Sequence, residues 1–164
     1  MNVSKATATK FLQSDEGAIA EVYSSYRNLL YFIIATYVRE KEDCDDVYQE
    51  LFLRILSKKD EIKDPQSLHY YLCSMAKNMA IDFAKKQAHV DTSEEMEETA
   101  EAGESQLDYF LPYDVTREEK AILGYRLTFG FSWKEVASMM GIPAPTARLR
   151  YAQAIKKIKG AYQK

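Results

Sequence analysis

The stretch “WKEVASMMGIPAPTARLRYAQAIKKIK”, residues 133–159, predicts two helices joined by a tight turn. Ser132, just before it, and Glu135 have the spacing of a capping box, in which each side chain bonds to the other residue's backbone N–H. The first helix therefore begins after Ser132. We expect it to end at Met140, because Gly141 readily adopts the left-handed conformation that follows many helices.

Two prolines set the start of the second helix. Pro143 cannot continue the preceding helix, and the residue before a proline avoids the helical region. We therefore expect Ala144 to lie outside the last helix and Pro145 to be its first residue. A helix, a glycine turn and a second helix form the skeleton of a helix-turn-helix.

The last predicted helix has an apolar side and a basic side. At about 100° per residue, the apolar side consists of Ala147, Tyr151, Ala154, Ile155 and Ile158. The opposite side and its flanks consist of Thr146, Arg148, Leu149, Arg150, Gln153, Lys156, Lys157 and Lys159. No acidic residue interrupts the basic side, which indicates an anionic partner.

DNA is the partner that this helix would suit. The second helix of a helix-turn-helix enters the major groove, where its N-terminal residues reach base edges. Arginine can bind guanine, glutamine can bind adenine, and leucine can contact the methyl group of thymine. Lysines further along the helix are better placed for phosphates. The alternative is an ordinary C-terminal helix with a solvated basic side. The candidate base contacts are Thr146, Arg148, Leu149, Arg150 and Gln153, and the candidate phosphate contacts are Lys156 and Lys157.

Charge is divided unevenly among three segments of the chain. Residues 1–87 hold 12 Lys/Arg and 13 Asp/Glu, residues 88–116 hold nine Asp/Glu and no Lys/Arg, and residues 117–164 hold 10 Lys/Arg and three Asp/Glu. The middle segment has too few apolar residues to form a core, so we expect a flexible, self-repelling linker. Although the whole chain has a net charge of −3, its basic C-terminal segment indicates contact with nucleic acid.

Composition excludes several other classes. Cys44 and Cys73 have no CxxC spacing, so we expect buried free thiols in a reduced, cytoplasmic protein. The first residues, “MNVSKATATKF”, lack the apolar core of a signal peptide, and the longest uncharged run, at residues 28–38, is too short to span a membrane. No nucleophile–base pair, glycine-rich phosphate loop or metal-ligand spacing is evident. These observations predict a protein that is not an enzyme and has no cofactor or metal.

The sequence before the linker predicts three long helices, at about residues 15–39, 44–56 and 65–87. Ser14 or Asp15 is suited to cap the first of them. No stretch shows the alternation typical of strands.

After the linker, Thr116 and Glu119 form another capping box, before a helix that we expect to end near Thr128. The predicted fold class is therefore all-α, with two small helical domains at residues 1–87 and 111–164 and a flexible acidic linker at residues 88–110.

The second predicted helix has an unusual outward face. Its residues there follow the spacing i, i+3, i+4 and i+7, which places them on one side. A leucine among polar residues suits a partner surface, although single exposed leucines are also common. The face is formed by Asp46, Gln49, Glu50 and Leu53, with Arg54 beside them.

Three motifs, in this order, resemble the bacterial sigma-70 family, and specifically its extracytoplasmic-function (ECF) group. “DCDDVYQELFLRIL” (residues 43–56) is similar to the polymerase-binding helix of these sigma factors. “YLCSMAKNMAIDFAKK” (residues 71–86) resembles their promoter-melting helix. The segment from Thr116 to Lys159 resembles their C-terminal promoter-reading domain, a helix-turn-helix that follows a loose linker.

The resemblance implies a sigma factor that directs core RNA polymerase to promoters. It implies that residues 1–87 bind polymerase and recognise and melt the −10 element, and that residues 111–164 recognise the −35 element. An anti-sigma factor is implied as a further partner. Polymerase would bind to Asp46, Gln49, Glu50, Leu53 and Arg54. The −10 DNA would contact Lys58, Lys59, Lys63, Tyr71, Lys77, Asn78, Lys85 and Lys86, and the −35 DNA would contact the last helix.

The linker is long enough for this arrangement. The 24 residues from Gln87 to Phe110 can extend to roughly 80 Å, whereas two turns of B-DNA measure about 70 Å. Two other interpretations remain open. A helix-turn-helix regulator independent of polymerase would ordinarily need a dimer to read a palindrome, and an interaction protein that only titrates an anti-sigma factor would not need the basic last helix.

Overall fold

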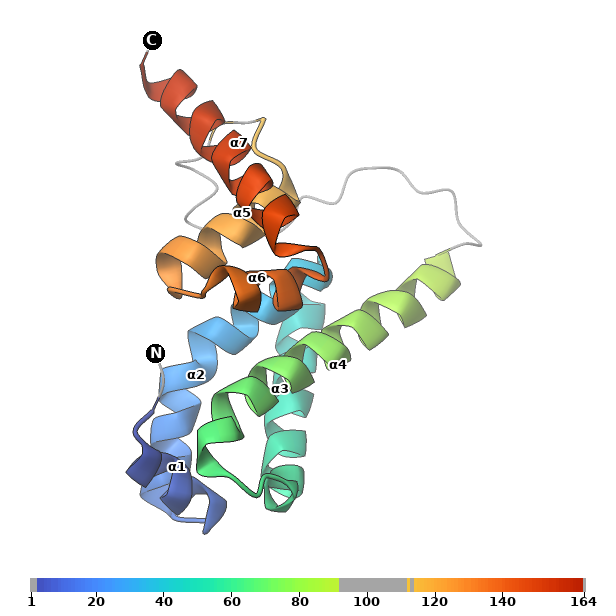
Figure 1. Cartoon of the computed structure of the whole chain (residues 1–164). Coiled ribbons are helices and arrows are strands. Elements are labelled where there is room, and N and C mark those ends of the chain that lie inside the picture. Colours follow the sequence, from blue (N-terminus) through green and yellow to red (C-terminus); the bar gives the residue numbers. More distant parts are fainter. Residues whose placement is uncertain (1–2, 92–111, 113, 164) are drawn as a thin grey trace. The chain divides into compact units, whose positions relative to one another are not determined.

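The computed structural model describes residues 3–91, 112 and 114–163, and every regular element in those ranges is helical (Figure 1). The chain divides into two compact units, residues 1–102 and 103–164. The prediction of an all-α fold is therefore confirmed for the described residues. Within the same ranges, we find no helix that combines the length and apolarity needed to cross a membrane.

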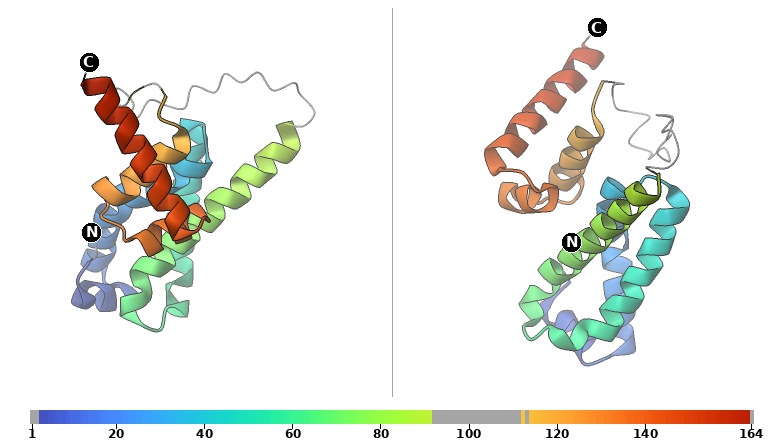
Figure 2. Two further views of the ribbon diagram at one scale, coloured as in Figure 1. Left: turned by 45° about the horizontal axis from the view of Figure 1, so that its top comes forward. Right: turned by 90° about the vertical axis from the view of Figure 1, so that its right-hand side faces the viewer.

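The first unit is a bundle of α1 (Lys5–Leu12), α2 (Glu16–Tyr37), α3 (Lys41–Lys58) and α4 (Leu68–Asp91). The short 3₁₀ helices η1 (Lys59–Glu61) and η2 (Pro65–Ser67) connect α3 to α4. The long helices α2, α3 and α4 pack against one another, and α1 packs against α2, as Figures 1 and 2 show. The side chains buried most completely in this unit include Phe11, Tyr26, Leu29, Leu30, Ile33, Ile34, Leu51, Ile55, Leu68 and Leu72.

Helix boundaries in this unit differ from the predictions at three places. Helix α1 was not predicted at all, although the Ser4 hydroxyl caps it by accepting a bond from the Thr7 N–H at 3.1 Å. Helix α3 begins at Lys41 instead of after Asp43, because Lys and Glu are good helix formers. Helix α4 continues to Asp91. The rest of the predicted linker, residues 92–110, lies outside the described residues.

Two other features of this unit agree with the predictions. Asp15 caps α2, and its carboxylate accepts a bond from the Ala18 N–H at 2.8 Å. Cys44 and Cys73 are both buried free thiols.

The second unit consists of α5 (Arg117–Leu123), a π-helical turn labelled η3 (Gly124–Thr128), α6 (Trp133–Met140) and α7 (Ala144–Tyr162). Helix α7 packs against both α5 and α6. Val115, Leu123 and Ala154 are buried in the core of the second unit, and Tyr151, Ile155 and Ile158 pack against them. The inner stripe predicted for the last helix is therefore confirmed.

The predictions made from local sequence signals in the second unit were largely correct. Both capping boxes form, at Thr116–Glu119 and at Ser132–Glu135. Gly141 ends α6 in the left-handed conformation with φ of 66°, which a side chain would disfavour.

The prediction for Ala144 was wrong, because α7 begins at this residue and Pro143 is its extended N-cap. The restriction that Pro145 places on Ala144 is a preference rather than a prohibition, and a proline in the first turn removes no helical hydrogen bond.

Candidate functional site

The outward face of α3 brings all five predicted polymerase-binding residues together. Asp46, Gln49, Glu50, Leu53 and Arg54 are all exposed, and 69% of Leu53 is accessible to solvent. Arg54 donates a bond to the Glu50 carboxylate at 3.0 Å, one helical turn away. The opposite side of the helix is buried in the bundle, so this face presents one apolar side chain within a polar surround.

Aromatic packing fixes the orientation of α3. The Tyr23 ring meets Phe52 edge-on, with 4.6 Å between ring centroids. Near the start of α3, the Tyr31 hydroxyl donates a bond to Asp45 at 3.0 Å. Burial and this carboxylate raise the pKa of Tyr31 to about 12, so the hydroxyl stays protonated and remains a donor. These contacts from α2 hold the outward face of α3 toward solvent.

The three lysines predicted to contact DNA near the connection between α3 and α4 differ in their exposure to solvent. Lys58 and Lys63 are exposed, which leaves their ammonium groups accessible to phosphates. The Lys59 side chain, in contrast, is only 11% exposed. Its Nζ donates to the Ser14 hydroxyl at 2.5 Å and to the Leu12 carbonyl at 3.4 Å.

Helix α4 aligns three of its five predicted DNA contacts. Tyr71, Asn78 and Lys85 follow at intervals of seven residues, so they lie along one side of the helix. Lys86 is exposed beside them, whereas Lys77 lies about 100° round the helix from Asn78. The Tyr71 hydroxyl donates to Glu61 in η1 at 3.4 Å, and the pKa of Tyr71 is raised by burial and by this carboxylate.

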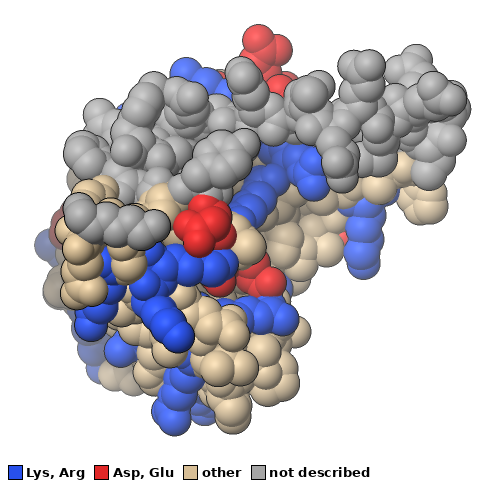
Figure 3. All heavy atoms as spheres, turned by 90° about the horizontal axis from the view of Figure 1, so that it is seen from above, with Lys and Arg blue, Asp and Glu red and all other residues tan. Residues whose placement is uncertain are grey.

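The helix-turn-helix of the second unit exposes part of the predicted reading surface. Leu149, which is 58% exposed, Gln153 and Lys156 lie in the open, and Thr146 is half-buried beside them. Arg148 is exposed too, and its guanidinium carbon lies 5.9 Å from the ring centroid of Trp133. Figure 3 draws the Lys and Arg side chains of the described residues in blue and the Asp and Glu side chains in red.

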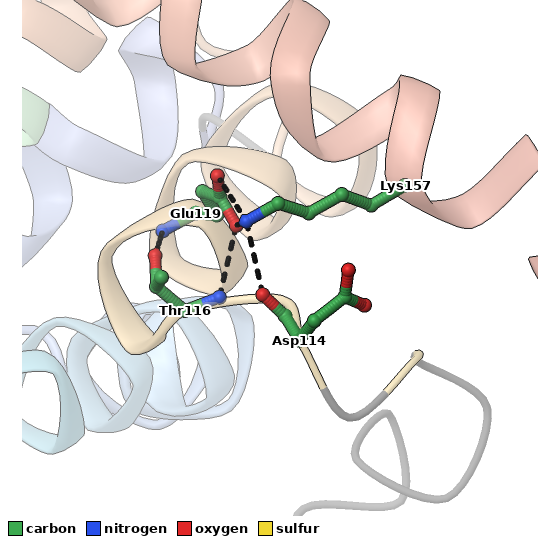
Figure 4. A network of polar contacts seen from close by, with 4 residues as sticks. All are labelled: Asp114, Thr116, Glu119 and Lys157. Atoms are coloured by element: carbon green, nitrogen blue, oxygen red, sulfur yellow. Dashed lines mark hydrogen bonds and ion pairs between the residues drawn. The ribbon is translucent and has the colours of Figure 1, made fainter. Parts of the chain in front are cut away.

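Two basic residues of α7 already have acidic partners inside the unit. Arg150 forms an ion pair with Glu118. Lys157 donates to the Glu119 carboxylate at 2.9 and 3.0 Å and to the Asp114 carbonyl at 2.9 Å (Figure 4). The helical pattern had placed Lys157 on the outer side, but its side chain bends toward α5.

The carboxylate of Glu119 is the centre of this network. Its side chain is 7% exposed, and it also accepts a bond from the Thr116 N–H at 2.9 Å. Burial alone would raise the pKa of Glu119, but the bonds from Lys157 and Thr116 outweigh burial and lower it. The ionised carboxylate therefore ties α5 to α7.

A family model decides what the first unit is: sigma-70 region 2 matches residues 22–90. Residues 22–90 are therefore similar to region 2 of the sigma-70 family. The match spans most of α2, all of α3 and nearly all of α4, so region 2 contains both the outward face of α3 and the aligned side of α4.

Similarity continues along most of the chain. The sigma factor SigV of Bacillus subtilis is 21% identical over 155 residues, with 90% of this chain and 92% of the relative covered. The ECF sigma factor SigX of the same species is 22% identical, with 84% and 80% covered. The resemblance to the ECF group of the sigma-70 family is confirmed. Sigma factors act in transcription initiation and are not enzymes, so the prediction of a non-catalytic protein is confirmed as well.

The fold also has a solved counterpart. The sigma factor RpoE of Bartonella quintana, solved with the anti-sigma factor NepR, superimposes with a TM-score of 0.64, covering 88% of this chain and 95% of that one. At 16% identity, this likeness supports the helical architecture alone.

Sequence reasoning missed two groups that shape these surfaces. Helix α1 lies outside region 2, and the Ser4 and Thr7 pair would have indicated its start. Trp133 lies beneath Arg126, 4.5 Å from its guanidinium carbon, as well as near Arg148. The position of Trp133 directly after the capping residue Ser132 indicated the start of the helix. No sequence pattern indicated that Arg126 and Arg148 lie against the Trp133 ring.

Proposed function

We propose that this chain binds the core of a bacterial RNA polymerase and directs it to promoters with specific −10 and −35 elements. The observation that carries the proposal is the outward face of α3 within region 2. An exposed leucine surrounded by Asp46, Gln49, Glu50 and Arg54 combines an apolar anchor with a polar rim, the usual anatomy of a protein interface. Polymerase subunits would bury Leu53 and pair with its charged neighbours.

Region 2 would also recognise and open the −10 element. Bases taken out of a duplex need stacking partners and cations along the backbone. Tyr71, Asn78 and Lys85 provide such a row on α4, with Lys86 next to it. Lys58 and Lys63 are exposed where α3 and α4 connect, so they would contact phosphates, and Lys77 would contact DNA from the adjoining side of α4.

The second unit would recognise the −35 element through α7. Thr146, Arg148, Leu149 and Arg150 are near the N-terminus of α7, the part of a recognition helix that reaches base edges. Gln153 follows one turn later. Lys156 would bind a phosphate and add a salt-dependent, sequence-independent term to affinity. Lys157 would contribute mainly by holding α7 in position, because its ammonium group is shared between Glu119 and Asp114.

A second protein partner follows from the same family. The RpoE relative was solved in complex with an anti-sigma factor, and we propose that this chain is controlled in the same way. Such an inhibitor would cover the outward face of α3. The chain would act in the cytoplasm, where both polymerase and promoters are found.

Co-purification with bacterial core polymerase tests the proposal. The variant Gln49→Ala/Glu50→Ala/Leu53→Ala should lose polymerase while keeping its helical circular dichroism. A matched variant, Ser24→Ala/Ser25→Ala/Asn28→Ala, changes three exposed positions on α2 and should bind as well as the wild type. A wild-type chain that ignores polymerase but binds duplex DNA would be an independent regulator, and one that binds neither would support a role limited to protein interactions.

A further inference from the structure

Lys59 joins the N-terminal helix to the connection between α3 and α4. Its ammonium group lies at the C-terminal end of α1, where it donates to the Leu12 carbonyl at 3.4 Å. It also donates to the Ser14 hydroxyl at 2.5 Å and lies 3.6 Å from the Asp60 carboxylate. Lysines are rarely buried unless they are paired, and these three oxygen partners account for a side chain that is only 11% exposed.

Ser14 adopts a backbone conformation that side chains usually avoid. Its φ is 63°, and it is the one residue other than glycine with positive φ among the described residues. That conformation is held only where the surroundings determine it. Here the bond from Lys59, together with the Ser14 N–H bond to the Phe11 carbonyl at 3.1 Å, fixes the turn between α1 and α2.

The clasp between Lys59 and Ser14 supports the α3–α4 connection from one side. Lys59 is the first residue of η1, and α1 also packs against η2 at the far end of the same connection. Within it, Glu61 accepts the bond from Tyr71 of α4, and the Asp64 carboxylate caps η2 by accepting from the Gln66 N–H at 2.9 Å. The connection is therefore held at η1 by Lys59, at η2 by α1, and at Glu61 by Tyr71.

A lysine bound in this way is poorly suited to neutralise a phosphate. To reach DNA, Lys59 would have to give up three protein oxygens and leave the C-terminal end of α1, whose partial negative charge favours a cation. Its neighbour Lys58 is exposed and needs no such exchange.

We propose that Lys59 and Ser14 are positioning residues that hold the α3–α4 connection in the conformation that receives the −10 element, and that α1 thereby belongs to the promoter-recognition machinery. This inference rests on the proposed function for its DNA partner. The clasp itself does not depend on that function, and the two parts can be tested separately.

The first measurement is amide hydrogen exchange on the free full-length chain. Lys59→Met keeps an unbranched side chain one heavy atom shorter than lysine and removes the ammonium group, and Ser14→Ala removes the hydroxyl from the other side of the clasp. Each should lower the protection of residues 59–67 about tenfold, the size expected when a charge-assisted hydrogen bond is lost. The double variant should lose little more than Lys59→Met alone, because Lys59→Met already breaks the contact that Ser14→Ala removes. Lys58→Met is the matched control and should leave protection unchanged. Equal protection in all variants would overturn the clasp.

The second measurement uses holoenzyme formed from the full-length chain and bacterial core polymerase. Duplexes with a randomised −10 region are selected by the wild-type holoenzyme, and the variants are then compared on the selected sequence. Lys59→Met and Ser14→Ala should both weaken the base preference and the extent of opening, with an unchanged dependence on salt. Lys58→Met should lower the log–log salt slope by about one unit, as expected for one lost phosphate contact, and keep the base preference.

The outcomes separate the inference from the proposed function. If the wild type selects no sequence, the proposed function fails whatever the exchange data show. If it selects one and Lys59→Met lowers the salt slope as Lys58→Met does, while Ser14→Ala has no effect, Lys59 is a phosphate contact and the inference is wrong. Should Ser14→Ala fail to fold, Ser14→Gly removes the same hydroxyl and tolerates the positive φ.

Discussion

The outward face of α3 and the basic side of α7 were predicted by the same helical periodicity, yet they differ in how the folded chain uses their charges. On α3, Arg54 pairs with Glu50 of its own face, so the whole face stays open. On α7, Arg150 and Lys157 reach α5 and pair with Glu118 and Glu119. Helical periodicity predicts the side of the helix on which a residue lies. A long lysine or arginine side chain can nevertheless reach a partner on a neighbouring helix, which periodicity within one helix does not indicate.

Removal of the buried tie in the second unit should have the largest effect. Lys157→Met would leave the Glu119 carboxylate buried without its cation, so we expect the free energy of unfolding of this unit to fall by about 3 kcal/mol. Urea unfolding followed by the fluorescence of Trp133, the single tryptophan, measures this unit selectively. Lys156→Met, one residue away and exposed, should change the value by less than about 0.5 kcal/mol. Similar losses in both variants would mean that the two lysines are equivalent.

Acid should weaken the same tie. The pKa of Glu119 is lower in the folded chain than its ordinary value of 4.5. Its contribution to stability is therefore complete above that ordinary value and is lost as the pH falls through the lower folded value. Trp133-monitored unfolding between pH 6 and pH 3 should show this loss, and Glu119→Gln should reduce the pH dependence. An unaltered pH profile in Glu119→Gln would assign the acid sensitivity to another carboxyl.

The exposed ion pair should matter least for stability. Arg150 and Glu118 are 35% and 40% exposed, and exposed pairs contribute about 0–1 kcal/mol. Glu118→Gln should therefore change the unfolding free energy by about 0.5 kcal/mol or less, measured by the same fluorescence. A loss as large as that of Lys157→Met would remove the distinction between the two ties.

The fold was largely predictable because its signals are local. Asp15, Thr116, Ser132 and Gly141 act through hydrogen bonds or backbone angles within four residues of themselves, so the sequence contains the whole motif. Helix α1 was missed because it is a single short element whose buried residues, Ala8 and Phe11, are too few to show a period.

The candidate surfaces were only partly predictable, for a different reason. The residues of the open face of α3 all belong to one helix, so periodicity within that helix was sufficient to predict them. The roles of Lys59 and Lys157 depend on partners 45 and 38 residues away in the chain, and no pattern within their own helices indicates those partners. In both cases a lysine next to an exposed lysine is bound by oxygen atoms from another element.

The most direct test of the account compares one leucine from each surface. Leu53 on α3 and Leu149 on α7 are 69% and 58% exposed, so their replacement by alanine removes the same groups from two open sites. In an equilibrium titration of the labelled full-length chain with core polymerase and no DNA, Leu53→Ala should raise the Kd by about tenfold or more, as for the anchor of an interface. Leu149→Ala should leave the Kd unchanged. An unchanged Kd for Leu53→Ala, or equal losses from both variants, would contradict the assignment of α3 to polymerase.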